Sequence, residues 1–303
     1  GHSAEQPHHI FSGTKSFASI VAMLAEADGI LELDEHVADT ITEWKGDAKR
    51  ERITVRQLLD FTSGLRKIDA RLHSRRTEDK YALAVSTRAV REPGRRFQYG
   101  SVHLTVFGEF LKRKLRAFDA EKYAQADYVT YLTERLLDPI GCHVANWIRD
   151  QAGNPMVPYG AFLTAREWAK FGLFLLHRGE VRGEALLEPD KLSRCFVGSK
   201  ANPNYGLNFW LVSEDGRTTE HVPADTIGAF GMYKQKLWVI PSRDLVIVRF
   251  GKTGVLSGFR DSEFFARLFA TPAATTSRPT TASLPSEPGT AAEPGASADP
   301  APK

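Results

Sequence analysis

A serine and a lysine stand three residues apart in the segment Phe11-Ser12-Gly13-Thr14-Lys15. Positions i and i+3 share one face of a helix, so the Ser12 hydroxyl and the Lys15 ammonium can meet. Serine becomes a nucleophile at neutral pH when a neighbouring base takes its proton, and burial can lower the pKa of a lysine until it is that base. The spacing would serve acyl transfer, although taken alone it fits a capping serine beside a solvated lysine even better.

A tyrosine stands on a loop further along the chain. The segment Phe97-Gln98-Tyr99-Gly100-Ser101 follows Glu92-Pro93-Gly94 and precedes a helical pattern. A tyrosine with its ordinary pKa of about 10 is no base, but a lysine ammonium beside it makes the phenolate accessible. Tyr99 is therefore either a third member of the same site or an aromatic residue of the core.

Apolar periodicity predicts the helices that would hold these residues. A first helix starts near Ser12 and stops at Asp28-Gly29, and a short second helix, capped by Thr54, ends at Ser63-Gly64. Further helices are predicted over residues 102–115, 128–137, 165–177 and 259–269.

The sequence pattern changes to strands after Tyr205. Alternation over 207–211 predicts one strand, and the runs 236–240 and 245–250 predict an antiparallel hairpin around a turn at 241–244. The expected fold class is α/β (α+β), an antiparallel sheet flanked by helices. A mostly helical subdomain at about 66–200 lies between the nucleophile helix and the late strands.

Composition separates a folded domain over 1–270 from its tail. With 42% hydrophobic and 25% charged residues the chain can bury a core, whereas residues 271–303 are rich in Pro, Ala, Ser and Thr and are predicted to be disordered. A net charge of +3 argues against a nucleic-acid partner, and no apolar run is long enough for a membrane span. The two cysteines, Cys142 and Cys195, lack metal-ligand spacing, so no metal site is expected.

Positive charge is concentrated in one stretch of the chain. Residues 66–96 hold ten Lys and Arg against four Asp and Glu, a local charge of +6. A solvated helical face is the favoured interpretation, with docking on an anionic surface as the alternative.

Several motifs together resemble the serine β-lactamase and penicillin-recognising superfamily, most of all its class C, DD-peptidase and family VIII esterase branch. The likeness covers about 8–270, with the elements in family order. It rests on the nucleophile motif around Ser12, on Tyr99 where a Tyr-x-Asn motif belongs, and on the following segments: Ile53-Thr54-Val55-Arg56-Gln57-Leu58-Leu59-Asp60-Phe61-Thr62-Ser63-Gly64-Leu65, Leu163-Thr164-Ala165-Arg166-Glu167 and Tyr205-Gly206-Leu207-Asn208-Phe209-Trp210.

The resemblance implies a β-lactamase/transpeptidase-like fold that needs no cofactor. It implies Ser12 as nucleophile, Lys15 and Tyr99 as the proton-transfer pair, and the amides of Ser12 and Ala229 as the oxyanion hole. The third family motif would fall on Thr226-Ile227-Gly228, although Gly228-Ala229-Phe230-Gly231 offers two glycines and hence a shifted register.

Two departures from the family pattern bear on the substrate. Ser101 replaces the asparagine of Tyr-x-Asn, and Thr226 replaces the cationic or imidazole residue that helps to bind a substrate carboxylate. A neutral ester or amide is therefore favoured over a β-lactam. Among nearby cations, Lys234, Lys236 and Arg260 are expected to be solvated, although any of them could supply charge at the site. His2, His8 and His9 near the N-terminus could bind a metal, but they are likewise expected to be solvated.

The start of the chain is the other departure. Only eleven residues precede Ser12, where the family carries one or two strands of the sheet. The expectation is a truncated chain that lacks these N-terminal strands and leaves a sheet edge unpaired.

The sequence therefore predicts a serine hydrolase that cleaves a small-molecule ester, amide or peptide through a Ser12 acyl-enzyme. The alternative is a catalytically weak penicillin-fold protein that binds its ligand as a sensor or scaffold. A monomer is expected, and an exported, periplasmic location is favoured by family habit alone.

Overall fold

The last third of the chain supplies the main sheet. The structure is a computed structural model that describes residues 3–211, 221–252 and 258–270. The chain divides into one unit of residues 1–268 and a second of 269–303. The predicted tail, 271–303, lies outside the described residues. The sheet is antiparallel throughout. Its strands, in spatial order, are β6 (Trp210–Leu211), β7 (Ile227–Gly231), β8 (Gln235–Ile240) and β9 (Leu245–Arg249).

The hairpin predicted from sequence is present as β8 and β9. Leu237 pairs with Val248 and Val239 with Val246, and a short 3-10 turn, Pro241–Arg243, closes the hairpin. Asp244 follows the turn at φ 47°, the left-handed conformation in which aspartate is tolerated. The strand predicted over 207–211 is shorter than expected, because Asn208 is also left-handed (φ 60°) and pairing starts only at Trp210.

Two helices cover opposite faces of the hairpin. On one face α7 (Ala165–Leu176) approaches so closely that a Cβ on Gly172 would lie 2.5 Å from Val246 and 2.9 Å from Leu237. On the other face α9 (Asp261–Leu268) lays the ring of Phe264 against that of Trp238, with centroids 5.6 Å apart. Successive residues of a strand point to opposite faces, so all six positions of β8 are buried. Lys236 is one of them, and the prediction that it is solvated is wrong.

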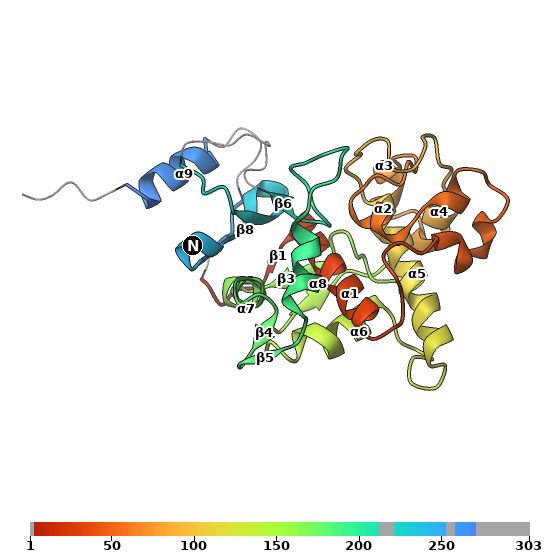
Figure 1. The fold of residues 1–303 in the computed structure, drawn as a ribbon, viewed down its shortest axis with the longest axis horizontal. Helices are drawn as coiled ribbons and strands as arrows, with labels where there is room; N and C mark the ends of the chain where they lie inside the picture. Colours follow the sequence, from red (N-terminus) through yellow and green to blue (C-terminus); the bar gives the residue numbers. More distant parts are fainter. Residues whose placement is uncertain (1–2, 212–220, 253–257, 271–303) are drawn as a thin grey trace, which may run out of the picture. The chain divides into compact units, whose positions relative to one another are not determined.

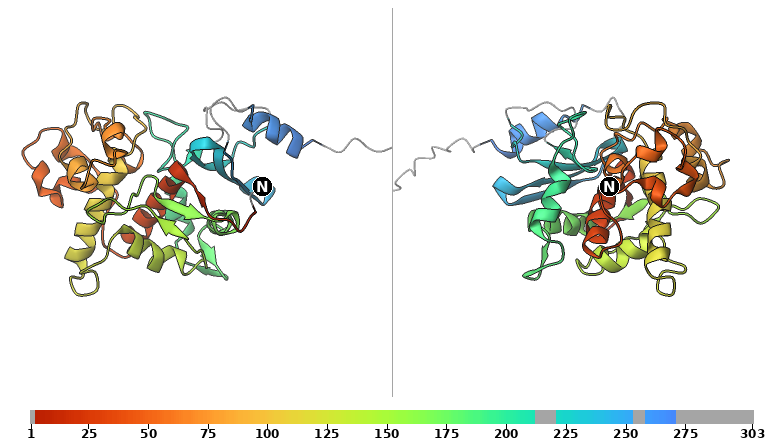
Figure 2. Two further views of the ribbon diagram at one scale, coloured as in Figure 1. Left: turned by 180° about the vertical axis from the view of Figure 1, so that it is seen from behind. Right: turned by 45° about the vertical axis from the view of Figure 1, so that its right-hand side comes forward.

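Helices from the first 140 residues form the other side of the unit (Figure 1). The central helix α1 (Ser16–Ala27) has ten of its twelve residues buried, and it runs between these helices and the sheet in both Figure 1 and Figure 2. The remaining helices are α2 (Val55–Leu59), α3 (Asp69–Leu72), α4 (Lys80–Val85), α5 (Val102–Phe118), α6 (Tyr128–Leu132) and, later in the chain, α8 (Pro189–Ser193).

Most helix predictions are confirmed within a few residues at each end. Thr54 caps α2 in a capping box with Gln57, as its type suggested. The helix stops at Leu59 and not at Ser63-Gly64, because Phe61 takes a left-handed φ of 60° and ends the run early. The pattern over 128–137 splits into α6 and a π-helical turn, Thr133–Leu137.

Short strands complete the fold near the N-terminus. β1 (His8–His9) and β2 (Asn146–Trp147) pair on either side of β3 (Ala161–Leu163), and β4 (Glu180–Val181) forms a small hairpin with β5 (Glu184–Ala185). Within the described ranges β9 pairs with β8 alone.

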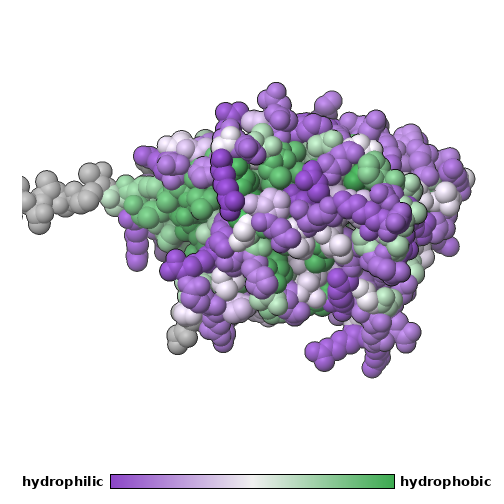
Figure 3. Space-filling view, turned by 90° about the horizontal axis from the view of Figure 1, so that it is seen from below, coloured by the Kyte–Doolittle hydropathy of each residue, from purple (hydrophilic) through white to green (hydrophobic). Residues whose placement is uncertain are grey.

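The outer strand of the sheet is incompletely covered. All five β9 residues are only half-buried, as expected of an edge strand. On the face drawn in Figure 3, hydrophobic surface gathers toward one end and hydrophilic surface dominates elsewhere. No helix in the described part of the chain is long and apolar enough to cross a membrane.

Candidate active site

A 3-10 turn, Phe11–Lys15, carries the serine and the lysine into the start of α1. The turn packs tightly, since a Cβ on Gly13 would lie 2.6 Å from the ring of Trp168 in α7. Phe11, directly before the serine, has a left-handed φ of 48°, which costs a residue with a side chain about 1–2 kcal/mol. Ser12 therefore lies in a strained turn, and the packing of that turn against α7 fixes its position.

Lys15 is buried with its amine against the serine. The Lys15 Nζ atom donates to Ser12 Oγ at 3.0 Å and to the Pro158 carbonyl at 2.8 Å. Only 3% of the residue is exposed. Among the described residues it forms no ion pair. Burial lowers the pKa of Lys15 to about 7, against a smaller opposing effect of the Asp69 carboxylate. A large share of the amine is therefore neutral near pH 7.

Tyr99 lies beside the same amine. Lys15 Nζ is 5.1 Å from the centre of the Tyr99 ring. The ring is held by three other aromatic residues, with centroids 5.3 Å from Phe61, 6.0 Å from Tyr205 and 5.8 Å from Trp210. A loop from the helical side and strand β6 together thus fix the tyrosine, and the structure brings Ser12, Lys15 and Tyr99 to one place.

Ser101 faces two residues that sequence reasoning missed. Its hydroxyl lies 3.0 Å from His73 Nε2, and its backbone N–H donates to Asp69 Oδ1 at 2.8 Å. Burial lowers the pKa of His73, which favours the neutral imidazole. Asp69 was visible in the sequence only as one of four acids in a basic stretch. The Pro158 carbonyl left no signal there, because any residue supplies one.

The candidate third motif leads into β7, with Thr226 directly before the strand and Ile227 and Gly228 at its start. The Thr226 hydroxyl donates to the Pro223 carbonyl at 2.6 Å and the residue is 1% exposed, so this hydroxyl is engaged inside its own turn. Gly228 pairs with Trp210 across the sheet, and a Cβ on it would lie 2.2 Å from the Phe230 ring.

Among the residues that the structure describes, β6 pairs with Ile227 and Gly228 of β7 and with no residue beyond Gly228. The edge of β7 from Ala229 onward therefore extends past the end of β6. There it meets the serine turn, since a Cβ on Gly231 would lie 2.1 Å from the Ile10 carbonyl. Ala229 is 1% exposed. Both glycines of this run thus serve close packing, and the second one adjoins the serine turn.

No cluster of three or more His, Cys, Asp or Glu that could hold a metal occurs in the part of the chain that the structure describes. Cys142 and Cys195 are both buried thiols, and burial raises the pKa of each to about 12. Neither cysteine is therefore a ready nucleophile.

Comparison with known proteins assigns the family. The model of the Beta-lactamase family matches residues 1–270, so the chain belongs to the beta-lactamase family. This bears out the resemblance stated above, and with it the mixed fold with antiparallel sheets. Comparison with curated proteins finds no match.

Solved structures show the same fold at low identity. A Bacillus anthracis protein assigned as a 6-aminohexanoate-dimer hydrolase is 19% identical, with a TM-score of 0.68 over 90% of this chain and 76% of that one. A beta-lactamase from Mycobacterium bovis is 22% identical, with a TM-score of 0.61 over 88% and 89%. A family VIII carboxylesterase is 15% identical, with a TM-score of 0.62 over 84% and 79%. The family fold thus accommodates several kinds of hydrolase.

Proposed function

We propose that this chain is a serine hydrolase that cleaves an ester or amide bond through an acyl-enzyme on Ser12. The observation that carries the proposal is the buried Lys15 amine, 3.0 Å from the serine hydroxyl and without a carboxylate partner in the described residues. A neutral amine at that distance is a general base for the hydroxyl proton.

The first half of the reaction forms the ester of Ser12. Ser12 Oγ attacks the substrate carbonyl carbon while its proton passes to Lys15 Nζ, with Tyr99 sharing that proton. The carbonyl oxygen becomes an oxyanion beside the amides of Ser12 and Ala229. When the tetrahedral intermediate collapses, the C–O or C–N bond breaks and the leaving group takes the proton.

Water completes the turnover. Tyr99 and Lys15 remove a proton from water, which attacks the acyl carbon and releases the acid and the free Ser12 hydroxyl. Ser101 stays a candidate substrate-binding residue, and with its amide on Asp69 and its hydroxyl on His73 it also fixes the loop that holds Tyr99.

The residue at the start of the third motif, Thr226, affects which substrates the active site can bind. Thr226 carries no charge and its hydroxyl is bonded to Pro223, so it offers a substrate carboxylate no cation at the position where the family has one. Esters and amides without a carboxylate next to the scissile bond therefore suit the site better than β-lactams.

Labelling with a fluorophosphonate tests the nucleophile. We expect one label per native chain and none on Ser12→Ala, while Ser16→Ala keeps the label. Ser16 is the matched control, because it lies in the same segment but its hydroxyl donates to the Asn208 carbonyl. A folded native chain that takes no label and hydrolyses no activated ester would contradict the proposal and favour the ligand-binding alternative.

A further inference from the structure

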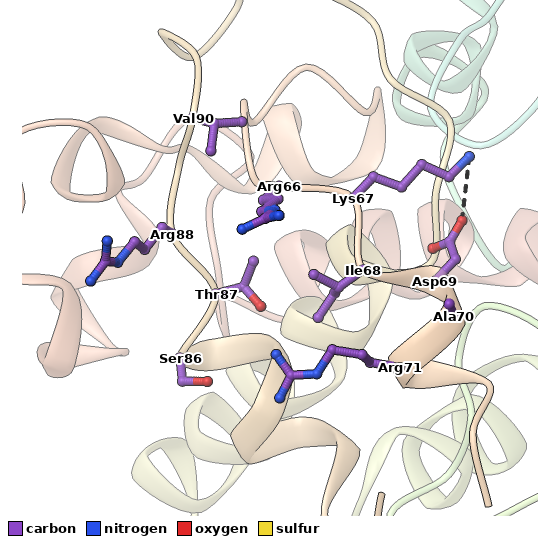
Figure 4. Close-up of a pocket in the computed structure, with 10 residues that line it drawn as sticks. All are labelled: Arg66, Lys67, Ile68, Asp69, Ala70, Arg71, Ser86, Thr87, Arg88 and Val90. Carbon is purple, nitrogen blue, oxygen red and sulfur yellow. Dashed lines mark ion pairs between the residues drawn. The ribbon is translucent and has the colours of Figure 1, made fainter.

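An open pocket of about 750 Å³ adjoins the Tyr99 loop (Figure 4). Residues 66–71 and 86–90 supply its walls, both from the basic stretch. The two segments are tied together by backbone, because the Arg66 N–H donates to the Arg88 carbonyl at 2.9 Å and Leu65 bridges to Ala89. The frame of the pocket is thus formed by the fold.

Positive charge dominates the walls. Of the ten lining residues, four are cationic and one is acidic, which gives 4 − 1 = +3: Arg66, Lys67, Arg71, Arg88 and Asp69. Figure 4 shows Lys67 turned toward Asp69, whose carboxylate lies 3.5 Å from the Lys67 amine. The three arginines form no ion pair with any residue that the structure describes. A guanidinium in that state is a strong site for a carboxylate, because its paired N–H groups match the two oxygens.

The border of the pocket contacts the catalytic loop. Asp69 Oδ1 accepts the Ser101 N–H at 2.8 Å, and a Cβ on Gly100 would lie 3.4 Å from Asp69 Oδ1 and 3.8 Å from the Lys67 side chain. Asp69, which lines the pocket, therefore also contacts the loop that carries Tyr99. The walls of the pocket also include apolar Ile68 and Val90, which suit a methylene chain between a reacting carbonyl and a distant charge.

We propose that this pocket binds the carboxylate of a substrate, so that the preferred substrates are linear esters or amides with a carboxylate remote from the scissile bond. The proposal rests on the function proposed above and names its substrate class. Arg66 and Arg71 of the pocket are as exposed as Arg75 and Arg96 outside it. The concave, partly apolar wall favours an inserted small molecule over a flat anionic surface, because a flat surface would engage all four arginines equally.

Matched double variants test the pocket on hydrolysis. Arg66→Gln/Arg71→Gln removes two charges inside it, and Arg75→Gln/Arg96→Gln removes two exposed charges of the same stretch outside it. The substrates are 4-nitrophenyl pentanoate, mono-4-nitrophenyl glutarate, with the carboxylate in the acyl part, and 4-carboxyphenyl pentanoate, with the carboxylate in the leaving group.

We expect the pocket variant to lose about tenfold or more in kcat/KM on one of the two anionic esters and less than about twofold on the neutral one. Which anionic ester suffers shows the side of the scissile bond that enters the pocket. The outside variant should change all three by less than about twofold. Equal losses in both variants, or an equal loss on neutral and anionic esters, would overturn the proposal.

Binding without turnover separates this proposal from the proposed function. Glutarate is titrated calorimetrically into Ser12→Ala, alone and combined with each double variant. Saturable binding that weakens at least about fivefold with the pocket variant only supports the pocket, even if the native chain hydrolyses nothing. No saturable binding overturns it. So does salt-sensitive binding of phosphatidylserine vesicles that both double variants weaken alike, since that outcome indicates a docking surface.

Discussion

Lys15 and Lys236 are both buried, but their amines have different partners. Lys236, fully buried on β8, has its Nζ 3.1 Å from an Asp261 oxygen and 3.8 Å from the centre of the Phe230 ring. Lys15 has a hydroxyl and a carbonyl in place of a carboxylate. A carboxylate beside a buried amine gives it an ion-pair partner inside the packed sheet, whereas burial without such a partner drives an amine toward the neutral base. The same residue type is therefore structural in the sheet and chemically available at the turn.

Replacing Lys15 has the largest expected effect. Lys15→Met keeps the length of the side chain but removes the base, and we expect hydrolysis to fall by about 10²–10⁴-fold. The free energy of unfolding at pH 7 should not fall, because no carboxylate is left unpaired and the cost of burying an amine whose pKa is lowered to about 7 is removed. Ester hydrolysis and urea unfolding of the same preparation measure both. Activity that survives the replacement would break the comparison.

Lys236→Met should show the opposite pattern. The Asp261 carboxylate would lose its partner, so we expect the free energy of unfolding to fall by about 3 kcal/mol. The activity per folded molecule should not change. Adding Asp261→Asn should restore part of the loss, since both charges are then gone. Urea unfolding of the single and double variants measures the coupling. An activity loss as large as that of Lys15→Met would contradict the assignment of Lys236 to packing.

The rate should report the Lys15 pKa. With that pKa lowered to about 7, the base is protonated below pH 7, and we expect kcat/KM on a neutral ester to fall about tenfold per pH unit there and to level off above it. The Lys236→Met variant should keep the same profile. A flat profile between pH 5 and 8 would mean that another group accepts the proton.

Stability should rise with pH for the same reason. Lys15 binds its proton with a pKa of about 7 in the folded chain against the ordinary 10.5, so between these values the unfolded chain holds more protons. The free energy of unfolding should therefore increase by up to about 1.4 kcal/mol per pH unit across that window. Lys15→Met should lack this slope. Urea unfolding at pH 7, 8 and 9 compares the two, and parallel curves would refute the lowered pKa.

The sequence predicted the helices, a helix cap and the hairpin, because each of these depends on residues that are close together in the chain. The periodicity of α5 and α7, the Thr54 cap and the β8–β9 hairpin could all be inferred from the order of residues. Lys236 could not be placed correctly, because alternation implies a solvated face only when one face of the sheet is open, and α9 covers that face.

The site itself was predictable only in part. The three-residue spacing placed Ser12 and Lys15 together, and the family resemblance added Tyr99. Asp69, His73 and Pro158 come to the site through the packing of separate segments, and no spacing in the sequence encodes that approach. The engagement of Thr226 by Pro223 is likewise a property of the folded turn.

The left-handed backbone of Phe11 lowers the stability of the fold while it positions the neighbouring Ser12. Glycine there would relax the backbone but would also remove the ring that contacts His9 and Tyr233, so a laboratory selection for heat tolerance would act on this codon only where the backbone relief is the larger effect. The same relaxation would loosen the aim of the neighbouring hydroxyl. Variants that gain melting temperature at Phe11 should thus be slower enzymes, which makes this residue a poor starting point for engineering robustness.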